Sequence, residues 1–563
     1  MDKRHFKPQH QDKYGVLRLI PLGGVGDVTK NMYIYEYGND IVIIDCGLGF
    51  PNEAMPGIDL VIPDISYLRD KKERIRGIVI THAHDDHIGG LPYLWPELQC
   101  PIYAQRLAAG FIRAKFSEHR LPKNQINTLS FDSKLQLGVF NLSFYRVSHS
   151  VPDSSGIVLE TPVGRVIHQA DFKLDWTPVN GQVTEVGKVA AAGDKGVLLM
   201  LIDALRIEKE GYNLSESTIQ PTFQRIEENS PGRIFLTTTS SNITRIQQAL
   251  NVAAASGRRV AFLGRSMEGN FQVARDLGYL EVPPGLVIAS DEIKRFSDNK
   301  LMIIIAGSQG QPGSALSRAA NNDSKYVSIK EGDSIVFSAD PIPGSESAQY
   351  ALIDKLTKMG GNVYYTAITD DLHVSGHATA EEQKIMINLA RPKYVMPIGA
   401  TYRQMKLFSS MAGQMGWGKD KVILAEDGLV VTARPGQVVI DGRVEAKNVY
   451  VDGLGVGDVG NIVLRDRRVL AEEGIVLVIV PMDTRTSQLG GELDIISRGF
   501  VFEKEAEGLL EGAKKIVRSA LSDHPQGVLD WRFIRRHIEE SLEQYFYEET
   551  QRRPMILPVV VEV

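Results

Sequence analysis

One segment carries most of the information about this chain: Gly77-Ile-Val-Ile-Thr81-His82-Ala83-His84-Asp85-Asp86-His87-Ile88-Gly89-Gly90. Its apolar start predicts a buried strand, and the polar residues follow where that strand should end. His82 and His84 alternate, so an extended backbone would point both side chains to one side. With Asp86 and His87 they offer imidazole and carboxylate ligands, which suit zinc. The segment therefore predicts a metal site; the alternative is a polar turn that holds three of the chain's 12 histidines.

Composition indicates a multidomain globular protein. The 563 residues exceed what one hydrophobic core supports, and the 43% hydrophobic and 23% charged content is ordinary. No apolar run approaches the ~20 residues of a membrane helix, and the N-terminus does not resemble a secretory signal, so we expect no membrane partner. Only Cys46 and Cys100 are present, which favours a reducing cytoplasm. With a net charge of -6, a nucleic acid partner would need a local basic groove and metal charge.

Apolar runs alternate with helical patterns on both sides of the histidine segment. The glycines in 23–27 lack GxGxxG spacing, so a tight hairpin is predicted there rather than a dinucleotide loop. Asp45 ends a predicted strand, where a role behind the metal ligands and a structural role are equally compatible with the pattern. The expected strands are 14–21, 32–36, 40–45, 102–104, 141–147 and 164–170, and the expected helices are 66–76, 91–98, 106–118, 503–521 and 531–550.

Two more potential ligands end predicted strands downstream. His149 follows the strand at 141–147, and Asp171 follows the strand at 164–170. A single residue at such a place is more often structural. Their combination with the upstream cluster gives a set of imidazoles with a carboxylate able to bridge two cations.

The order HxHxDH, then a distant His, then a distant Asp resembles the ligand order of the metallo-β-lactamase fold. Further motifs resemble ribonuclease J, the bacterial and archaeal branch of the β-CASP nucleases. These motifs are Val147-Ser-His-Ser-Val-Pro-Asp-Ser-Ser-Gly156, Gln169-Ala-Asp-Phe-Lys173, Gly264-Arg-Ser-Met-Glu268, Gly307-Ser-Gln-Gly310, Pro341-Ile-Pro-Gly344, His373-Val-Ser-Gly-His377 and Arg553-Pro-Met-Ile-Leu-Pro558. The resemblance covers the chain from about residue 14 to its end.

The resemblance implies an α/β architecture in which one domain interrupts another. A metallo-β-lactamase αββα sandwich would hold an inserted β-CASP domain, and a small C-terminal α/β domain associated with dimerisation would follow. The expected parts are an N-terminal tail at 1–13, the sandwich at 14–215 and 378–450, the β-CASP domain at 216–377, a glycine-rich linker at 451–464 and the C-terminal domain at 465–563.

The resemblance also implies two metal sites. His82, His84, His149 and Asp171 would hold one cation, and Asp86 and His87 would share Asp171 for the second. The family's remaining ligand lies in a His-Gly-Glu motif after Met-Pro, and here Gly399 stands at the histidine and Thr401 at the acid. Zn²⁺ is the expected cofactor, one or two per chain, with Mn²⁺ or Mg²⁺ possible at the weaker site.

The implied substrate is RNA, preferably with a 5′-monophosphate. A coordinated water with its pKa lowered to about 7 would attack the phosphodiester. The expected catalytic residues are Asp86 and His377, and the expected substrate-binding residues are Ser375, His377, His373, Ser241 and Asn242. Asp203 matches the family's acidic motif, which is reduced here. Candidates for an RNA channel are Arg245, Arg265, Arg318 and Arg403, although such arginines are usually solvated.

These observations favour a metal-dependent ribonuclease with 5′-to-3′ exonuclease and endonuclease activity, acting in RNA maturation and decay, including rRNA processing. The alternative is a weakly active or inactive RNA-binding paralogue within a ribonuclease complex, because of Gly399. The expected assembly is a homodimer or homotetramer, or a hetero-oligomer with a paralogue.

Overall fold

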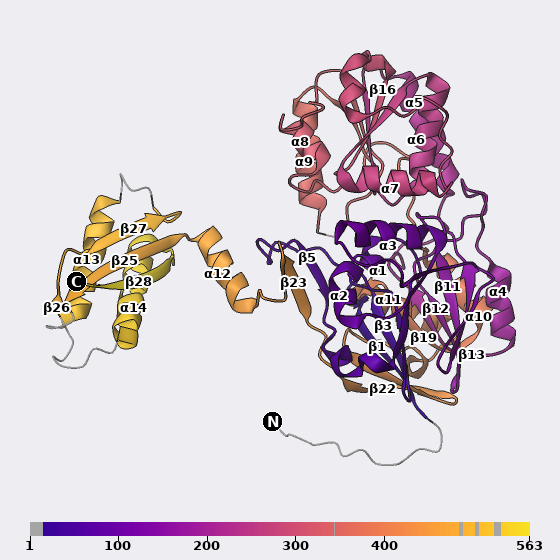
Figure 1. The fold of residues 1–563 in the computed structure, drawn as a ribbon, viewed down its shortest axis with the longest axis horizontal. Helices are drawn as coiled ribbons and strands as arrows, with labels where there is room; N and C mark the ends of the chain where they lie inside the picture. Colours follow the sequence, from indigo (N-terminus) through magenta and orange to yellow (C-terminus); the bar gives the residue numbers. More distant parts are fainter. Residues whose placement is uncertain (1–14, 343, 484–487, 502–505, 523–530) are drawn as a thin grey trace. The chain divides into compact units, whose positions relative to one another are not determined.

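The computed structural model describes residues 15–342, 344–483, 488–501, 506–522 and 531–563 (Figure 1). The expected tail at 1–13 and Pro343 of the Pro-Ile-Pro-Gly motif lie outside these residues. The chain divides into two compact units. One comprises the chain up to Phe50 together with Val61–Val449, and the other comprises Pro51–Leu60 and Tyr450–Val563.

The first unit contains an eight-stranded mixed sheet. Its central strand β4 reads Asp-Ile-Val-Ile-Ile, a β-branched run that suits a strand covered on both faces. From β4 onward the strands β6, β7 and β8 run parallel, so their carboxyl ends share one edge. The order is β22 (Gln437–Arg443), β21 (Leu429–Arg434), β1 (Leu17–Gly23), β3 (Met32–Tyr37), β4 (Asp40–Ile44), β6 (Ile75–Val79), β7 (Ile102–Gln105) and β8 (Ile126–Leu129).

A six-stranded sheet packs against the first. Buried side chains from both sheets, such as Tyr35 and Phe144, belong to one hydrophobic cluster. Its strands β12, β13 and β19 are parallel, so they also end at a common edge. The order is β19 (Pro392–Ile398), β13 (Val197–Asp203), β12 (Gly164–Gln169), β11 (Ser155–Thr161), β10 (Phe140–Arg146) and β9 (Lys134–Leu137).

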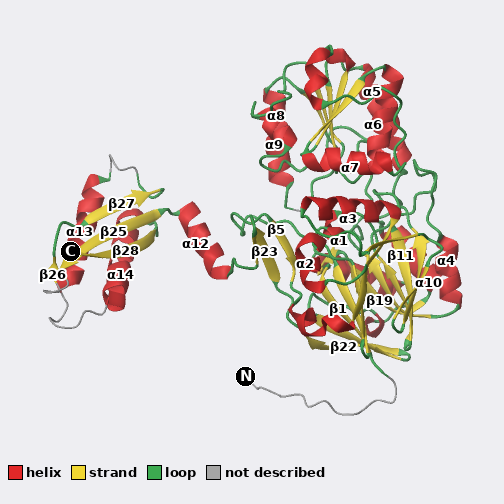
Figure 2. Cartoon of the chain, viewed as in Figure 1, coloured by secondary structure: helices red, strands yellow, loops and turns green. Residues whose placement is uncertain are grey.

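Helices on the outer faces complete the αββα sandwich (Figure 2). The segment expected as a helix at 66–76 is a 3-10 helix that ends at Arg74. The helices are η1 (Ser66–Arg74), α1 (Asp85–Ile88), α2 (Leu91–Leu98), α3 (Arg106–Glu118), α4 (Val186–Asp194), α10 (Ala380–Ala390), α11 (Tyr402–Gln414) and η5 (Lys419–Lys421). Two short strands, β2 (Val25–Gly26) and β20 (Ala400–Thr401), pair in parallel beside the sandwich, and β5 (Leu60–Pro63) precedes η1.

The insertion between β13 and α10 is a separate β/α layer with its own core. Its five strands are all parallel, as the alternation of short apolar runs and helical patterns predicts. The strand order is β15 (Arg259–Leu263), β16 (Leu301–Ile305), β14 (Ile234–Thr237), β17 (Ser334–Phe337) and β18 (Asn362–Tyr364). The helices are η2 (Glu216–Thr218), α5 (Ile219–Glu228), α6 (Ile243–Ser256), α7 (Arg265–Asp276), η3 (Ser290–Arg295), η4 (Asp298–Lys300), α8 (Ala315–Ala320) and α9 (Glu346–Lys358).

The second unit is an α/β layer around β25, whose residues alternate between buried and half-buried. The glycine-rich segment predicted as a linker at 451–464 contains a hairpin of β23 and β24 and the start of α12 at Asn461. Of the helix expected from Glu503, residues 503–505 lie outside the described part. The elements are β23 (Asn448–Asp452), β24 (Gly455–Val456), α12 (Asn461–Glu472), β25 (Ile475–Asp483), β26 (Gln488–Leu489), β27 (Asp494–Arg498), α13 (Glu507–Ser522), α14 (Trp531–Thr550) and β28 (Met555–Glu562).

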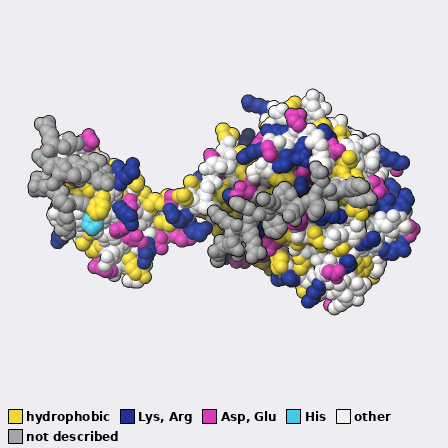
Figure 3. Space-filling model, turned by 90° about the horizontal axis from the view of Figure 1, so that it is seen from below, with side chains coloured by type: hydrophobic (Ala, Val, Ile, Leu, Met, Phe, Trp, Pro, Cys, Tyr) yellow, Lys and Arg dark blue, Asp and Glu magenta, His cyan; other side chains and the backbone are white. Residues whose placement is uncertain are grey.

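Neither unit's described residues include a helix that is long and apolar enough to cross a membrane. On the face shown in Figure 3, Lys and Arg side chains are interspersed with Asp and Glu, as the net charge of -6 suggests.

Candidate metal centre

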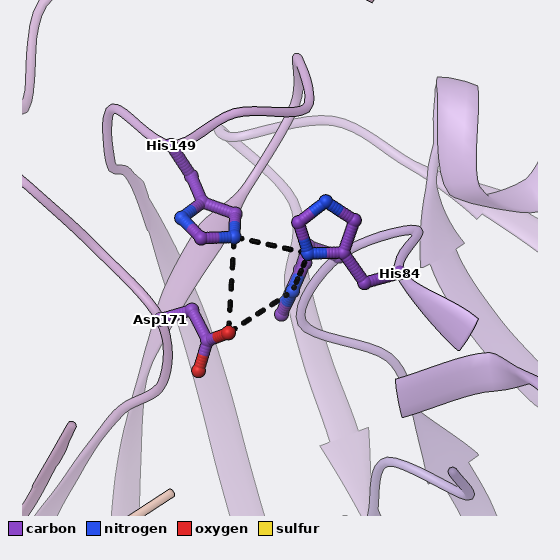
Figure 4. Close-up of side chains that lie close together, drawn as sticks. His84, His149 and Asp171 are labelled. Carbon is purple, nitrogen blue, oxygen red and sulfur yellow. Dashed lines mark hydrogen bonds and ion pairs between the residues drawn. The ribbon is translucent and has the colours of Figure 1, made fainter. Parts of the chain in front are cut away.

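Four predicted ligands converge at the common edge of the two sheets. His82 and His84 follow β6, His149 follows β10, and Asp171 follows β12. His84 Nδ1 lies 3.2 Å from His82 Nε2 and 3.1 Å from His149 Nε2, and Asp171 Oδ2 lies 3.6 and 3.7 Å from the latter two atoms (Figure 4). All four ligand atoms lie within 4.8 Å of one another. We refer to this set as the first half of the centre.

The hydrogen bonds of the imidazoles show that these residues fit a cation. His82 Nδ1 contacts the Thr81 hydroxyl at 3.0 Å, His149 Nδ1 contacts the Gly376 carbonyl at 2.7 Å, and His84 Nε2 contacts the Ser150 hydroxyl at 3.0 Å. The contacts of His82 and His149 hold the ring proton on Nδ1 and leave Nε2 bare, because the Thr81 hydroxyl gives its proton to Asp45 and the Gly376 carbonyl can only accept. With His84 Nδ1 and a carboxylate facing these two nitrogens, the donor set suits a divalent cation.

A glycine in the HVSGH segment makes one of these contacts possible. A Cβ at Gly376 would lie 2.7 Å from the His149 ring, so any other residue would displace the backbone that accepts the Nδ1 proton. The carbonyl of this glycine therefore fixes the orientation of the His149 ring.

The second half of the centre consists of Asp86 and His87, on the single turn of α1, together with the shared Asp171. His87 Nε2 lies 3.4 Å from Asp86 Oδ2 and 3.5 Å from Asp171 Oδ2. His87 Nδ1 donates to Asp45 Oδ2 at 2.7 Å, which orients Nε2 toward Asp86 and Asp171. These three ligand atoms form a second group that could hold an ion.

Gly399 lies beside this second half, at the turn between β19 and β20. A Cβ at Gly399 would stand 3.6 Å from Asp203 Oδ1 and 3.8 Å from Asp171 Oδ1, which is ordinary contact. A side chain therefore fits, although the backbone φ of +61° strains any L-residue. Thr401, at the position of the expected acid, caps α11, and its hydroxyl donates to Gln404 Oε1.

His377 stands at the mouth of the centre next to Asp203, at the end of β13. Its Nδ1 lies 2.9 Å from Asp203 Oδ2 and 3.8 Å from Asp171 Oδ2. Burial opposes protonation of His377, but Asp203 and Asp171 outweigh it and raise its pKa to about 9. Burial likewise opposes ionisation of Asp171, yet His377 and His87 hold its pKa well below the usual value. Two carboxylates and an imidazolium thus share the cavity.

The remaining predicted substrate-binding residues lie elsewhere or serve the fold. Ser375 Oγ accepts from the His377 amide at 3.1 Å, so it shapes the turn that carries His377. His373 Nδ1 contacts an Arg245 guanidinium nitrogen at 2.8 Å and lies outside the ligand groups of the described residues. Asn242 caps α6 by accepting from the Arg245 amide at 3.1 Å, and Ser241 beside it is buried.

The burial of Arg245 contradicts the prediction that it lines an RNA channel. It is fully buried and donates to Glu216 Oε1 at 2.9 and 2.7 Å and to the Ser338 carbonyl at 2.7 Å. Glu216 also lies 3.8 Å from Lys173 Nζ, and Lys173 follows the ligand Asp171 by two residues. Arg245 therefore links the inserted layer to the ligand loop instead of facing solvent. Arg265, Arg318 and Arg403 are exposed, and Arg403 pairs with Glu208.

Two supporting residues, Asp45 and Asp203, received no definite role from the sequence. Asp45 accepts from the amide and hydroxyl of Thr81, both at 2.8 Å, and from His87 Nδ1, so one carboxylate orients ligands of both halves. Asp203, whose role was left uncertain, positions His377. Asp45 and Asp203 both end apolar strands, and that position is the signal that sequence analysis could have weighted more heavily.

Three segments of the chain match models of known protein families. Residues 25–210 match the metallo-β-lactamase superfamily, residues 231–356 the ribonuclease J β-CASP domain, and residues 462–563 the ribonuclease J C-terminal domain. The two-sheet fold and its histidine-rich edge thus define a protein of the metallo-β-lactamase superfamily with an inserted β-CASP domain.

Curated relatives are similar over nearly the whole chain. "Ribonuclease J2" of Bacillus subtilis is 39% identical, with 97% of this chain and 99% of the relative covered. "Ribonuclease J 1" of Streptococcus pyogenes is 37% identical (96% and 97% covered), and "Ribonuclease J 2" of Staphylococcus epidermidis is 35% identical (97% and 98% covered). The chain belongs to the ribonuclease J family, a family of nucleases within the hydrolases. The resemblance in the motifs is confirmed.

A solved structure of a protein of unknown function from Enterococcus faecalis has a TM-score of 0.52 with 15% identity, and covers 76% of this chain and 100% of its own. At that identity it supports the fold alone.

Proposed function

We propose that this chain is a divalent-cation-dependent ribonuclease that hydrolyses RNA from a 5′-monophosphorylated end in the 5′-to-3′ direction and also cleaves internally, in RNA maturation and decay. The observation that carries the proposal is the convergence of the imidazoles of His82, His84 and His149 on Asp171, with His377 and Asp203 alongside. Membership of the ribonuclease J family and the names of its relatives support RNA as the substrate.

The first half would hold one cation through His82, His84, His149 and Asp171, and the second half would hold another through Asp86, His87 and the shared Asp171. Zn²⁺ suits the nitrogen-rich first half, whereas Mn²⁺ or Mg²⁺ suits the oxygen-rich second half. A bound divalent cation supplies activated water at neutral pH and neutralises the charge of a phosphodiester.

The chain's own residues would orient and protonate the substrate. His377 is anchored at Nδ1 by Asp203, which leaves Nε2–H to donate to a phosphate oxygen. The same proton can pass to the departing ribose oxygen as water attacks phosphorus. Asp86 borders the position of the attacking water and can accept its proton. The buried Lys173, Glu216 and Arg245 network holds the inserted layer against the ligand loop and so fixes where RNA would enter.

A second candidate function is favoured by Gly399 and Thr401. Without the family's last ligand, the chain could act as a weakly active or inactive RNA-binding paralogue that joins an active subunit. The name of the "Ribonuclease J2" relatives is compatible with a paralogue. We expect a homodimer or homotetramer, or a hetero-oligomer with a paralogue, in the cytoplasm, where the two buried thiols Cys46 and Cys100 stay reduced.

Cleavage of a 5′-monophosphorylated RNA by purified protein, with Zn²⁺ or Mn²⁺ added after chelation, tests the proposal. We expect shortening from the 5′ end that a 5′-triphosphate slows. His377→Gln should suppress cleavage while RNA binding is kept. Retention of full activity by that variant would point to a contaminating nuclease. RNA binding without any cleavage under either cation would favour the paralogue function, and light scattering of the protein in solution reports its assembly.

A further inference from the structure

Asn31 is a buried residue that lies directly against the second half of the centre. Its backbone amide donates to the Asp86 carbonyl and its carbonyl accepts from the Gly47 amide, both at 2.9 Å. Its side-chain Nδ2 lies 3.2 Å from His87 Nε2 and 3.4 Å from Asp86 Oδ2. The carboxamide is therefore fixed at the two ligands that belong to the second half alone.

Two glycines make room for Asn31. A Cβ at Gly24 would lie 2.2 Å from Asn31 Oδ1, and a Cβ at Gly47 would lie 1.6 Å from the Asp86 carbonyl oxygen that accepts from the Asn31 amide. Gly24 also has a φ of +86°, which L-residues rarely adopt. Gly24 thus leaves space for the carboxamide, and Gly47 leaves space for the backbone contact that holds Asn31 beside Asp86.

The hydrogen bonds of Tyr33 allow the carboxamide two orientations. The Tyr33 hydroxyl lies 2.9 Å from Asn31 Oδ1 and 3.2 Å from the Gly24 carbonyl, but it has only one proton to donate. When that proton goes to the Gly24 carbonyl, the phenol oxygen can accept from the amide NH₂ of Asn31. A half-turn of the carboxamide meets this requirement without changing its shape, and it turns the amide oxygen toward His87 and Asp86. The half-turn gives up the long contacts of Nδ2 with the Val28 carbonyl (3.4 Å) and the Asp86 carbonyl (3.3 Å).

Charge decides which orientation holds. Without a cation, the NH₂ group faces the Asp86 carboxylate, which can accept from it. With a cation between these groups, the NH₂ protons would oppose it, whereas the amide oxygen is a ligand that hard divalent cations prefer. The orientation of Asn31 is therefore coupled to occupancy of the second half.

We propose that the Asn31 amide oxygen is the fourth protein ligand of the second cation, in place of the histidine that Gly399 does not supply. This inference rests on the proposed metal centre. It gives the second half three oxygen donors and one nitrogen donor, from Asn31, Asp86, Asp171 and His87. Such a set favours Mn²⁺ or Mg²⁺ over Zn²⁺, in contrast to the three imidazoles of the first half.

The test is a Mn²⁺ titration of the chelator-stripped full chain, in which electron paramagnetic resonance measures unbound Mn²⁺. Asn31→Leu, which keeps the shape but removes the donors, should weaken the second equivalent by about tenfold or more and leave the first unchanged. Asn31→Asp should tighten the second equivalent by a similar factor. Asn270→Leu is the control, because it removes a half-buried amide that bonds only Ser240 in the inserted layer.

Gly399→His provides a rescue. Added to Asn31→Leu, it should restore the second equivalent, since the histidine returns the missing donor. If Asn31→Leu binds two equivalents as the unaltered chain does, or if Asn31→Asp binds no tighter, the inference is overturned even should the leucine variant fold poorly. If the unaltered chain and every variant bind only one Mn²⁺ or Zn²⁺, the inference about Asn31 is also overturned, but the proposed function stands. Binding of no cation by the unaltered chain would remove the proposed centre itself.

Discussion

The first half of the centre takes its ligands from three loops that span both sheets, whereas the second half depends on one turn of α1. His82, His149 and Asp171 follow strands of different sheets, so packing of the sandwich brings them together. Asp86 and His87 are neighbours in sequence. Gly399 stands where the family has the distant histidine that would complete their ligand set. Replacement of that histidine by Gly399 thus leaves the fold and the first half unchanged. It should weaken cation binding in the second half alone.

The largest expected effect comes from Asp171→Asn, because this carboxylate serves both halves. We expect neither cation to bind tightly, and the loss of cleavage should exceed the roughly 10²- to 10⁴-fold effect of removing a proton donor. Metal analysis after gel filtration, together with cleavage of a labelled RNA, checks both effects. The comparison between halves fails if the variant keeps the second cation.

His377→Ala should separate chemistry from metal binding. Its side chain belongs to neither half, so we expect a loss of about 10²- to 10⁴-fold in the single-turnover cleavage rate with unchanged cation stoichiometry. Asp203→Asn, which removes only the anchor of His377, should have a smaller effect, about 10- to 100-fold. An equal loss of bound cation in either variant would show that His377 supports the metal sites instead.

Asp45→Asn should weaken both halves, and the second more than the first. His87 Nδ1 loses its direct acceptor, which typically costs about 10- to 100-fold in metal affinity. His82 is affected less, because it contacts Asp45 only through the Thr81 hydroxyl. Calorimetric titration with Mn²⁺ and Zn²⁺ measures the two affinities separately. Equal weakening of both would indicate a general loss of structure, which near-ultraviolet circular dichroism would reveal.

Gly399→His should make the cation affinities of the two halves more similar. The pocket accommodates a Cβ, and the imidazole would add a nitrogen ligand, so second-cation affinity and cleavage rate should rise, by about tenfold in affinity. The left-handed backbone costs about 1–2 kcal/mol, so the melting temperature without metal should fall slightly. Gly399→Ala carries the same strain without a ligand and is the matched control. A histidine variant that behaves like the alanine variant would mean that this position is not the missing ligand.

The sequence predicted the elements well where local pattern is enough, and the residues it predicted as ligands lie close together in the structure. The clustering of His82, His84 and His87 and the apolar runs of the strands are local signals, and most expected strands and helices match the structure within a few residues. Whether the domain boundaries and the functional roles of the ligands are right stays a prediction.

Contacts between residues that are distant in the sequence could not be predicted from local patterns. Arg245 looked like a surface arginine on a helix because nothing nearby in sequence shows that Glu216 and Ser338 cover it. Asn31 escaped notice because its contacts with Asp86 and His87 span more than fifty residues. The glycines at 453–460 fit both a linker and a hairpin, and pairing of β23 with β24 decides for the hairpin.

The most direct test of this account is calorimetric titration of the chelator-stripped chain with a divalent cation that both halves accept, such as Mn²⁺. We predict two separate binding events, one tight and one at least about tenfold weaker, with only the weaker event strengthened by Gly399→His. A single set of equal sites, or no binding at all, would contradict the inequality of the two halves on which the account depends.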